Sequence, residues 1–151
     1  MGAAVAASAY RHAEIETLSP RDLLVKLFQC MERSVDEGAL AMQNRQFEAS
    51  NRSCRRIRDI LFELQATLNH EAGGEIATRL EGIYRFVAGE VIEAGWRKDA
   101  ARLAGVRGII TSLREAWQGI QRAGMAQDFS WDRSARGYQQ LYEWALMRMR
   151  S

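Results

Sequence analysis

Two helical patterns meet in the stretch from Leu64 to Tyr84, which reads LQATLNHEAGGEIATRLEGIY. Steps of three, four or seven separate the apolar residues on both sides of the pair Gly73–Gly74: Phe47, Cys54, Ile57, Leu61, Leu64 and Leu68, then Ile76, Leu80, Ile83, Val87, Val91 and Ala94. Such steps place side chains on one side of an α-helix. Because glycine adopts the left-handed conformation that closes a helix, the pair predicts a short turn between two long antiparallel helices.

Two further amphipathic segments complete a four-helix pattern. Ser19 can cap a helix, Pro20 suits its first turn, and Asp22 stands three residues after the cap. Apolar seams follow on this helix and again after Gly95: Leu24, Phe28, Met31, Val35, Gly38 and Met42, then Leu103, Val106, Ile110, Leu113, Trp117 and Ile120. Four such helices with short connections predict an all-α fold, an antiparallel up-down four-helix bundle.

The ends of the chain differ from the seams in composition. We expect residues 1–121 to form the bundle domain, with an Ala-rich N-terminal arm at residues 1–16, and residues 122–151 to form an accessory C-terminal helix. A chain of 151 residues is long enough for one domain with a substantial core.

Composition excludes several classes of protein. A net charge of +2 does not call for a polyanionic partner such as nucleic acid. No run reaches the roughly 20 apolar residues of a membrane span, and the N-terminus lacks the pattern of a secretory signal, so we expect a cytoplasmic protein without membrane insertion. In that compartment free core thiols at Cys30 and Cys54 are favoured over a disulfide.

Residues that could support catalysis are sparse. Only His12 and His70 could serve as an imidazole base, and neither stands beside a nucleophile in the predicted helices. The seams are apolar and carry no metal-ligating Glu-x-x-His, and Gly73–Gly74 lacks the Lys of a phosphate loop. We therefore expect no catalytic, cofactor-binding or metal-binding residues and no enzyme activity.

Three separated motifs, in order along the chain, resemble the flagellin-specific export chaperones of the FliS family. The hairpin motif is the most specific and matches at Leu64, Thr67, Leu68, Asn69, Glu71, Gly73, Gly74, Glu75, Ile76, Ala77, Leu80, Ile83 and Tyr84. Thr17–Pro20 resembles the opening motif of the family and Leu113–Trp117 its closing motif, so the resemblance covers about residues 9–120. The chain departs from the family at Leu18, at Phe28 and over Gln29–Met31.

The resemblance implies a chaperone in the bacterial cytosol that binds the disordered C-terminal segment of flagellin. It would prevent premature polymerisation of flagellin and aid its secretion, with the flagellar export apparatus as a further partner. The sequence leaves a homodimer open. It also leaves two other functions open: a generic helical adaptor for another disordered client, and a cofactor- or metal-binding bundle.

Candidate partner-binding residues lie on the hairpin and the arm: Tyr10, Asn51, Ile60, Leu64, Leu80, Tyr84 and Phe86. We expect the hairpin stripe to fill the core with Ile57, Leu61, Leu64, Ile76, Leu80 and Ile83. Ile60, Tyr84 and Phe86 exceed what one seam needs and are candidates for a groove. Asn51 either fixes helix register or contacts a partner.

Two other stretches have two interpretations each. The resemblance implies an arm whose aromatic residue, Tyr10 here, covers part of the client groove; the alternative is a frayed terminus. The second helix carries Arg52, Arg55, Arg56 and Arg58 on its outer side, either a solvated face, which we favour, or a basic patch for an acidic partner.

The tail resembles an unrelated class of protein. Residues 122–145 are similar to the C-terminal helix of bacterial glycogen and starch synthases, over about 20 residues. The glycine-rich turns and α/β halves of a nucleotide-sugar transferase are absent from the sequence, so the similarity implies no enzyme. A fused helix and chance convergence both explain it.

Overall fold

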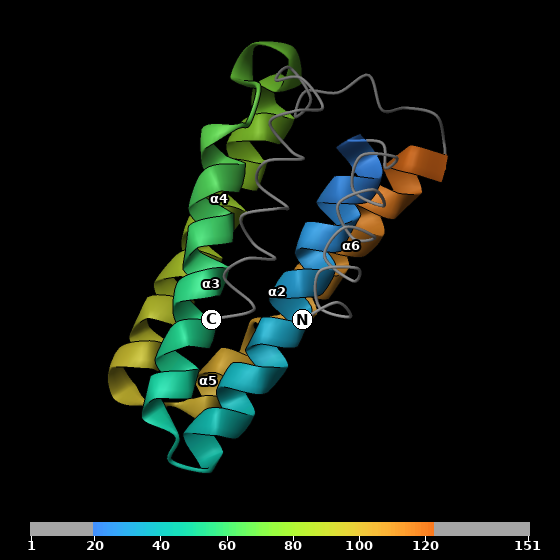
Figure 1. The fold of residues 1–151 in the computed structure, drawn as a ribbon. Coiled ribbons are helices and arrows are strands. Elements are labelled where there is room, and N and C mark those ends of the chain that lie inside the picture. The colour runs from blue at the N-terminus through green and yellow to red at the C-terminus, as the bar shows by residue number, and fades with distance from the viewer. Residues whose placement is uncertain (1–19, 123–151) are drawn as a thin grey trace, which may run out of the picture.

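The computed structural model describes residues 20–122, and all regular structure in this part of the chain is helical. The elements are α2 (Pro20–Gln43), α3 (Phe47–Ala66), α4 (His70–Arg97), α5 (Ala100–Gly105) and α6 (Arg107–Arg122). The four long helices alternate in direction (Figure 1), which confirms the expected all-α, up-down bundle. The arm expected at residues 1–16, with Tyr10, lies outside the described residues, and so does the tail beyond Arg122.

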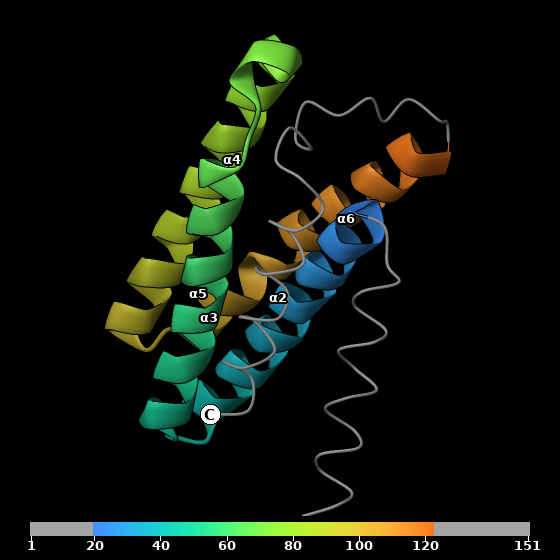
Figure 2. The same cartoon turned by 45° about the horizontal axis from the view of Figure 1, so that its top comes forward.

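Helix α2 is the element on which the others assemble. It packs against α3, α5 and α6, while α4 packs against α3 and α5. The α3–α4 hairpin and the α2–α6 pair converge where α5 lies and diverge toward the α3–α4 turn, as Figures 1 and 2 show. We call these the closed end and the open end of the bundle.

The core is built from the buried sides of all five helices. Its largest fully buried side chains are Phe28 and Tyr84, followed by Leu23, Leu24, Leu27, Met31, Ile57, Ile60, Leu61, Leu103 and Ile110. Each apolar side chain of this size contributes about 1.5–3 kcal/mol to folding when fully buried. The expected core positions Ile57, Leu61 and Leu64 on α3 are confirmed.

Helix α4 agrees with our expectation in its second half and departs from it nearer the turn. Ile76 and Ile83, expected in the core, are 54% and 37% exposed, whereas Ile60 and Tyr84, expected at a groove, are buried. The buried side of α4 is formed by Ala77, Tyr84, Val87, Ala88, Val91 and Ala94, which includes Val87, Val91 and Ala94 of the expected stripe. Near the turn, Ala77 and Tyr84 are buried where Ile76 and Ile83 were expected.

The turn between α3 and α4 precedes the glycine pair. Helix α3 ends at Ala66, and the Asn69 side chain caps α4 by accepting a hydrogen bond from the Ala72 backbone N–H at 3.0 Å. Gly74 then breaks the helical path inside α4, with φ of 52° and ψ of −123°. The glycine pair therefore does not end α3, because Asn69 already caps the next helix, but Gly74 does separate the first turn of α4 from the long helix that follows.

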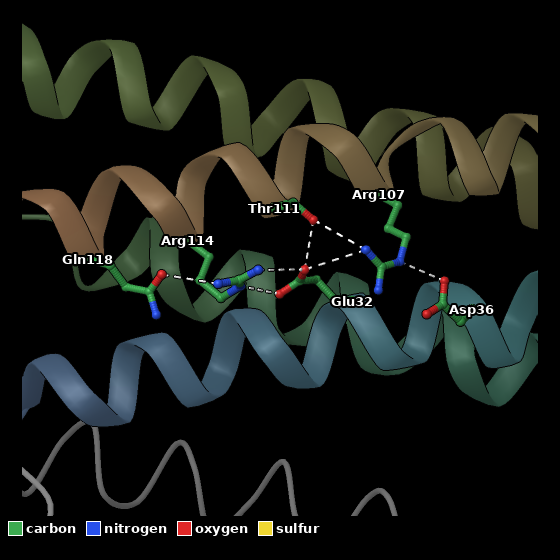
Figure 3. Close-up of polar contacts among 6 residues, drawn as sticks. All are labelled: Glu32, Asp36, Arg107, Thr111, Arg114 and Gln118. Atoms are coloured by element: carbon green, nitrogen blue, oxygen red, sulfur yellow. Dashed lines mark hydrogen bonds and ion pairs between the residues drawn. The ribbon is translucent and has the colours of Figure 1, made fainter.

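A polar network centred on Glu32 fixes α6 on α2 (Figure 3). The Glu32 carboxylate is buried and accepts hydrogen bonds from Arg114 Nε at 2.6 Å and from Thr111 Oγ1 at 2.7 Å. Arg107 Nε pairs with Asp36 Oδ1 at 2.8 Å one turn along. Burial opposes ionisation of Glu32, but these hydrogen bonds and the charges of Arg114 and Arg107 outweigh it and lower its pKa.

Both cysteines are buried free thiols, as expected. Burial raises the pKa of the Cys30 and Cys54 thiols, which makes them poor nucleophiles. Among residues 20–122, no helix combines the length and the apolar character needed to cross a membrane.

Candidate client-binding surface

One flank of α4 carries a row of apolar side chains that remain at the surface. Ile76, Ile83 and Phe86 are exposed, Phe86 by 57%, and Leu80 between them is half-buried against the core. Steps of four, three and three keep these side chains on one side of the helix. We call these four residues the α4 stripe.

The fold explains why the stripe is uncovered. The buried side of α4, which includes Tyr84 and Val87, faces the core, so the stripe lies on the flank next to it. The stripe runs from Ile76, near the start of α4, to Phe86, just past the middle of this helix. The end of α4 next to the α3–α4 turn stands apart from α6 (Figure 2). A single exposed apolar side chain is ordinary, but a contiguous row of them is typical of an interaction surface.

The candidate partner-binding residues separate into three groups. Leu80 and Phe86 meet on the α4 stripe, while Ile60, Leu64 and Tyr84 lie in the core beneath the hairpin. Asn51 is exposed near the closed end and accepts a hydrogen bond from Lys98 Nζ at 2.7 Å, which links α3 to the end of α4. The structure therefore places the predicted residues at two separate locations and in the core between them.

Sequence reasoning missed Ile76 and Ile83 as surface residues. The signal that could have identified them is the heptad Ala77–Tyr84–Val91, which competes with the Ile76–Ile83 step for the same core. It also missed Trp96, which is 84% exposed near the end of α4.

Ionisable groups near the turn are held in pairs. His70 Nε2 lies 3.0 Å from Glu81 Oε2, and Arg85 pairs with the same Glu81 carboxylate at 2.5 Å. Within residues 20–122, no group of three His, Cys, Asp or Glu side chains is arranged to hold a metal ion. The α4 stripe thus offers apolar contact and no chemical group for catalysis or ligation.

Comparison with known proteins connects this bundle to a family. The model of the family described as "Flagellar protein FliS" matches residues 2–124, most of the chain. The chain belongs to the FliS family. Its FliS relatives include the flagellar secretion chaperone FliS of Bacillus subtilis, 28% identical over 115 residues, which are 76% of this chain and 85% of the relative. The Salmonella typhimurium chaperone FliS is 27% identical over 125 residues, 80% of this chain and 93% of the relative.

A second similarity is short. Soluble starch synthase 1 of Oryza sativa subsp. indica is 42% identical over 45 residues, which are 28% of this chain and only 7% of that enzyme. A match to so small a part of the enzyme does not imply that this chain has the enzyme's activity. Membership in a family of flagellar secretion chaperones agrees instead with our expectation that this FliS-family chain is not an enzyme.

Proposed function

We propose that this chain is a flagellar export chaperone that binds the C-terminal segment of flagellin in the bacterial cytosol, with the α4 stripe as part of the binding surface. The observation that supports this proposal is an uncovered apolar row on a FliS-family bundle. The bound segment would be unable to join a growing filament, and the complex would be handed to the flagellar export apparatus.

The shape of the stripe suits a disordered client that folds on binding. A disordered segment commonly docks as an amphipathic helix whose apolar residues recur every three or four positions. The stripe presents its own side chains at that spacing over the eleven residues from Ile76 to Phe86, a length of about 15 Å along the helix. Burying an exposed phenylalanine such as Phe86 contributes about 1.5–3 kcal/mol, enough for one such row to anchor a helix.

The direct test is titration calorimetry with the C-terminal peptide of flagellin from the same organism. We expect binding of one peptide per chain with a negative heat-capacity change, because apolar surface is buried. Phe86→Asp should weaken binding at least tenfold, about 1.4 kcal/mol, while the Tm stays within a few degrees of wild type.

Phe62→Asp provides the matched control. Phe62 is 48% exposed, close to Phe86 in exposure, but it belongs to α3 and not to the α4 stripe. We expect this control to bind the peptide as wild type does. Equal loss in both variants would contradict a role for the stripe. No binding at tens of micromolar to any flagellin C-terminal peptide would reject the flagellin assignment and favour an adaptor for another disordered client.

A further inference from the structure

A second surface feature lies between the first half of α3 and the last turns of α4. It is a hollow of about 450 Å³, and the residues that matter in its lining are Cys54, Arg55, Arg58, Ile92, Trp96 and Lys98. We call it the α3–α4 hollow. Ile83 of the stripe and Ile92 of the hollow are nine residues apart, about two and a half helical turns, so they face opposite sides of α4.

Small residues and a helix end shape this hollow. A Cβ added at Gly95 would lie 3.6 Å from Cys54 Sγ, in ordinary van der Waals contact, so Gly95 and Cys54 face each other at the floor. Helix α4 ends at Lys98 in the left-handed conformation, with φ of 57°, and the Lys98 side chain reaches back to Asn51 on α3. The positive charges of Arg58 and Lys98 partly offset the rise in the Cys54 pKa caused by burial.

The charge of the hollow is uncompensated. Ion pairs with carboxylates hold many arginines in the described part of the chain: Arg56, Arg79, Arg85, Arg97, Arg102, Arg107 and Arg114. The hollow has cationic but no acidic lining residues. Arg58 Nε is buried and has no hydrogen-bond partner among the described residues, an arrangement that costs free energy unless a ligand supplies an acceptor.

An apolar rim accompanies this charge. Trp96 is 84% exposed and Ile92 is 45% exposed, both at the mouth of the hollow. Tryptophan and arginine are the residues most enriched among those that dominate binding energy at protein interfaces. The lining therefore calls for an occupant with negative charge beside an apolar side chain.

We propose that the α3–α4 hollow is a docking site for an acidic peptide segment of a partner protein. Carboxylates of the segment pair with Arg55 and Arg58, and a neighbouring aliphatic or aromatic side chain packs on Trp96 and Ile92. Because the hollow and the α4 stripe lie on opposite flanks of α4, a client on the stripe leaves the hollow accessible. The site suits a second partner that binds the loaded chaperone, and its existence does not depend on the identity of the client.

A designed peptide serves as the probe. We use a fluorescein-labelled 14-residue helical peptide with glutamate and leucine on one face, and a partner peptide with glutamine in place of each glutamate, roughly four turns of helix in each case. Fluorescence anisotropy with the full chain should show micromolar binding of the glutamate peptide only, weakened severalfold when NaCl rises from about 50 to about 300 mM.

Variants locate the binding. Arg55→Gln/Arg58→Gln should weaken the glutamate peptide at least tenfold, and Trp96→Ala should weaken it severalfold. Arg33→Gln/Arg52→Gln removes the same charge from exposed arginines outside the hollow and should bind like wild type. If the arginine pair variant loses helical signal, Ile92→Glu, at an exposed position, tests the same site by charge repulsion.

Several results would overturn the proposal. Equal affinity for both peptides, or an equal loss of affinity for the glutamate peptide in the two double variants, would show that the hollow does not recognise acidic side chains. Complete displacement of the peptide by inorganic phosphate, itself bound through Arg55 and Arg58, would make the hollow a small-anion site. Loss of flagellin-peptide binding in the Arg55→Gln/Arg58→Gln variant would show that the hollow is part of the client-binding surface. Unchanged flagellin binding supports a separate site.

Discussion

Glu32 is a single buried carboxylate that joins α2 to α6. It receives hydrogen bonds from both Thr111 and Arg114, and its polar atoms are otherwise shielded from water (Figure 3). Truncating one partner of such a network leaves the other charge in a partly buried position without compensation. The position of α6 therefore depends strongly on this one residue.

We predict that Glu32→Gln lowers the free energy of unfolding at pH 7 by about 1.5–3 kcal/mol. The folded-state pKa of Glu32 is lowered, so its stabilising effect is complete above the unfolded pKa of about 4.3 and disappears as pH falls through the folded value. The difference in the free energy of unfolding between wild type and variant should shrink below about pH 4, in urea titrations at several pH values.

Glu75→Gln, which breaks an exposed pair with Arg79, is the control, and its free energy of unfolding should differ little from that of wild type at any pH. A constant difference down to pH 2 would contradict the linkage.

At the scale of the element, the sequence predicted helices more reliably than their ends and faces. The seams of α2, α3 and α6 lie where periodicity placed them, because one apolar stripe dominates each segment. Helix α4 has two overlapping stripes near the turn, and the structure buries Ala77 and Tyr84 there while Ile76 and Ile83 stay exposed. Helix α5 was not separated from α6, since Leu103, Val106 and Ile110 continue one apolar pattern across the break.

The sequence predicted the candidate site only in part. Phe86 is exposed, as the count of apolar residues beyond one seam predicted, but the same count placed Ile60 and Tyr84 at a groove, and both are buried. Leu80, expected to fill the core, is half-buried against it. The hollow could not be predicted from the sequence, because Arg55 and Trp96 come from different helices and line it together only once α3 and α4 are packed. Contacts of this kind are properties of the packed pair and not of either helix alone.

The break in α4 provides a prediction for this element. Gly74 has φ of 52° and ψ of −123°, a conformation that is strained for any residue with a Cβ, although open space surrounds the position. Gly74→Ala should therefore lower the free energy of unfolding by about 1–3 kcal/mol through backbone strain alone. Gly82→Ala, also in open space but within regular helix, should raise stability by up to about 1 kcal/mol. Chemical denaturation of the two variants measures both changes in the free energy of unfolding. Equal changes would mean that the backbone at position 74 adapts to alanine without strain.

At the scale of the whole molecule, the bundle is closed at α5 and open toward the α3–α4 turn (Figure 1). Gly38 lies at the closed end, where a Cβ would come within 2.9 Å of Leu103 Cδ2 and 3.0 Å of Ser53 Cβ. Such tight packing joins α2, α3 and α5 into one rigid base. The apolar surface left for partners is consequently concentrated on the hairpin that rises from it.

The N-terminal arm provides the whole-molecule prediction. If Tyr10 and its neighbours cover part of the client surface, deleting residues 1–14 should tighten flagellin-peptide binding severalfold, because one buried aromatic contributes only about 1.5–3 kcal/mol before ordering costs. Calorimetry measures the affinity, and sedimentation shows whether uncovered chains associate into dimers. Unchanged affinity together with an unchanged sedimentation coefficient would mean that the arm does not cover the surface.

The single-file layout of the α4 stripe bears on how a bound segment leaves. Its anchors follow one another along the helix axis, from Ile76 to Phe86. When a segment bound along such a row is pulled by one end, its contacts with the row break one after another. At each moment the pulling force has to break only one contact, worth about 1.5–3 kcal/mol, and not all the contacts of the row together. A machine that pulls an unfolded chain by its end would strip this surface with a small force, even where the complex is tight at equilibrium.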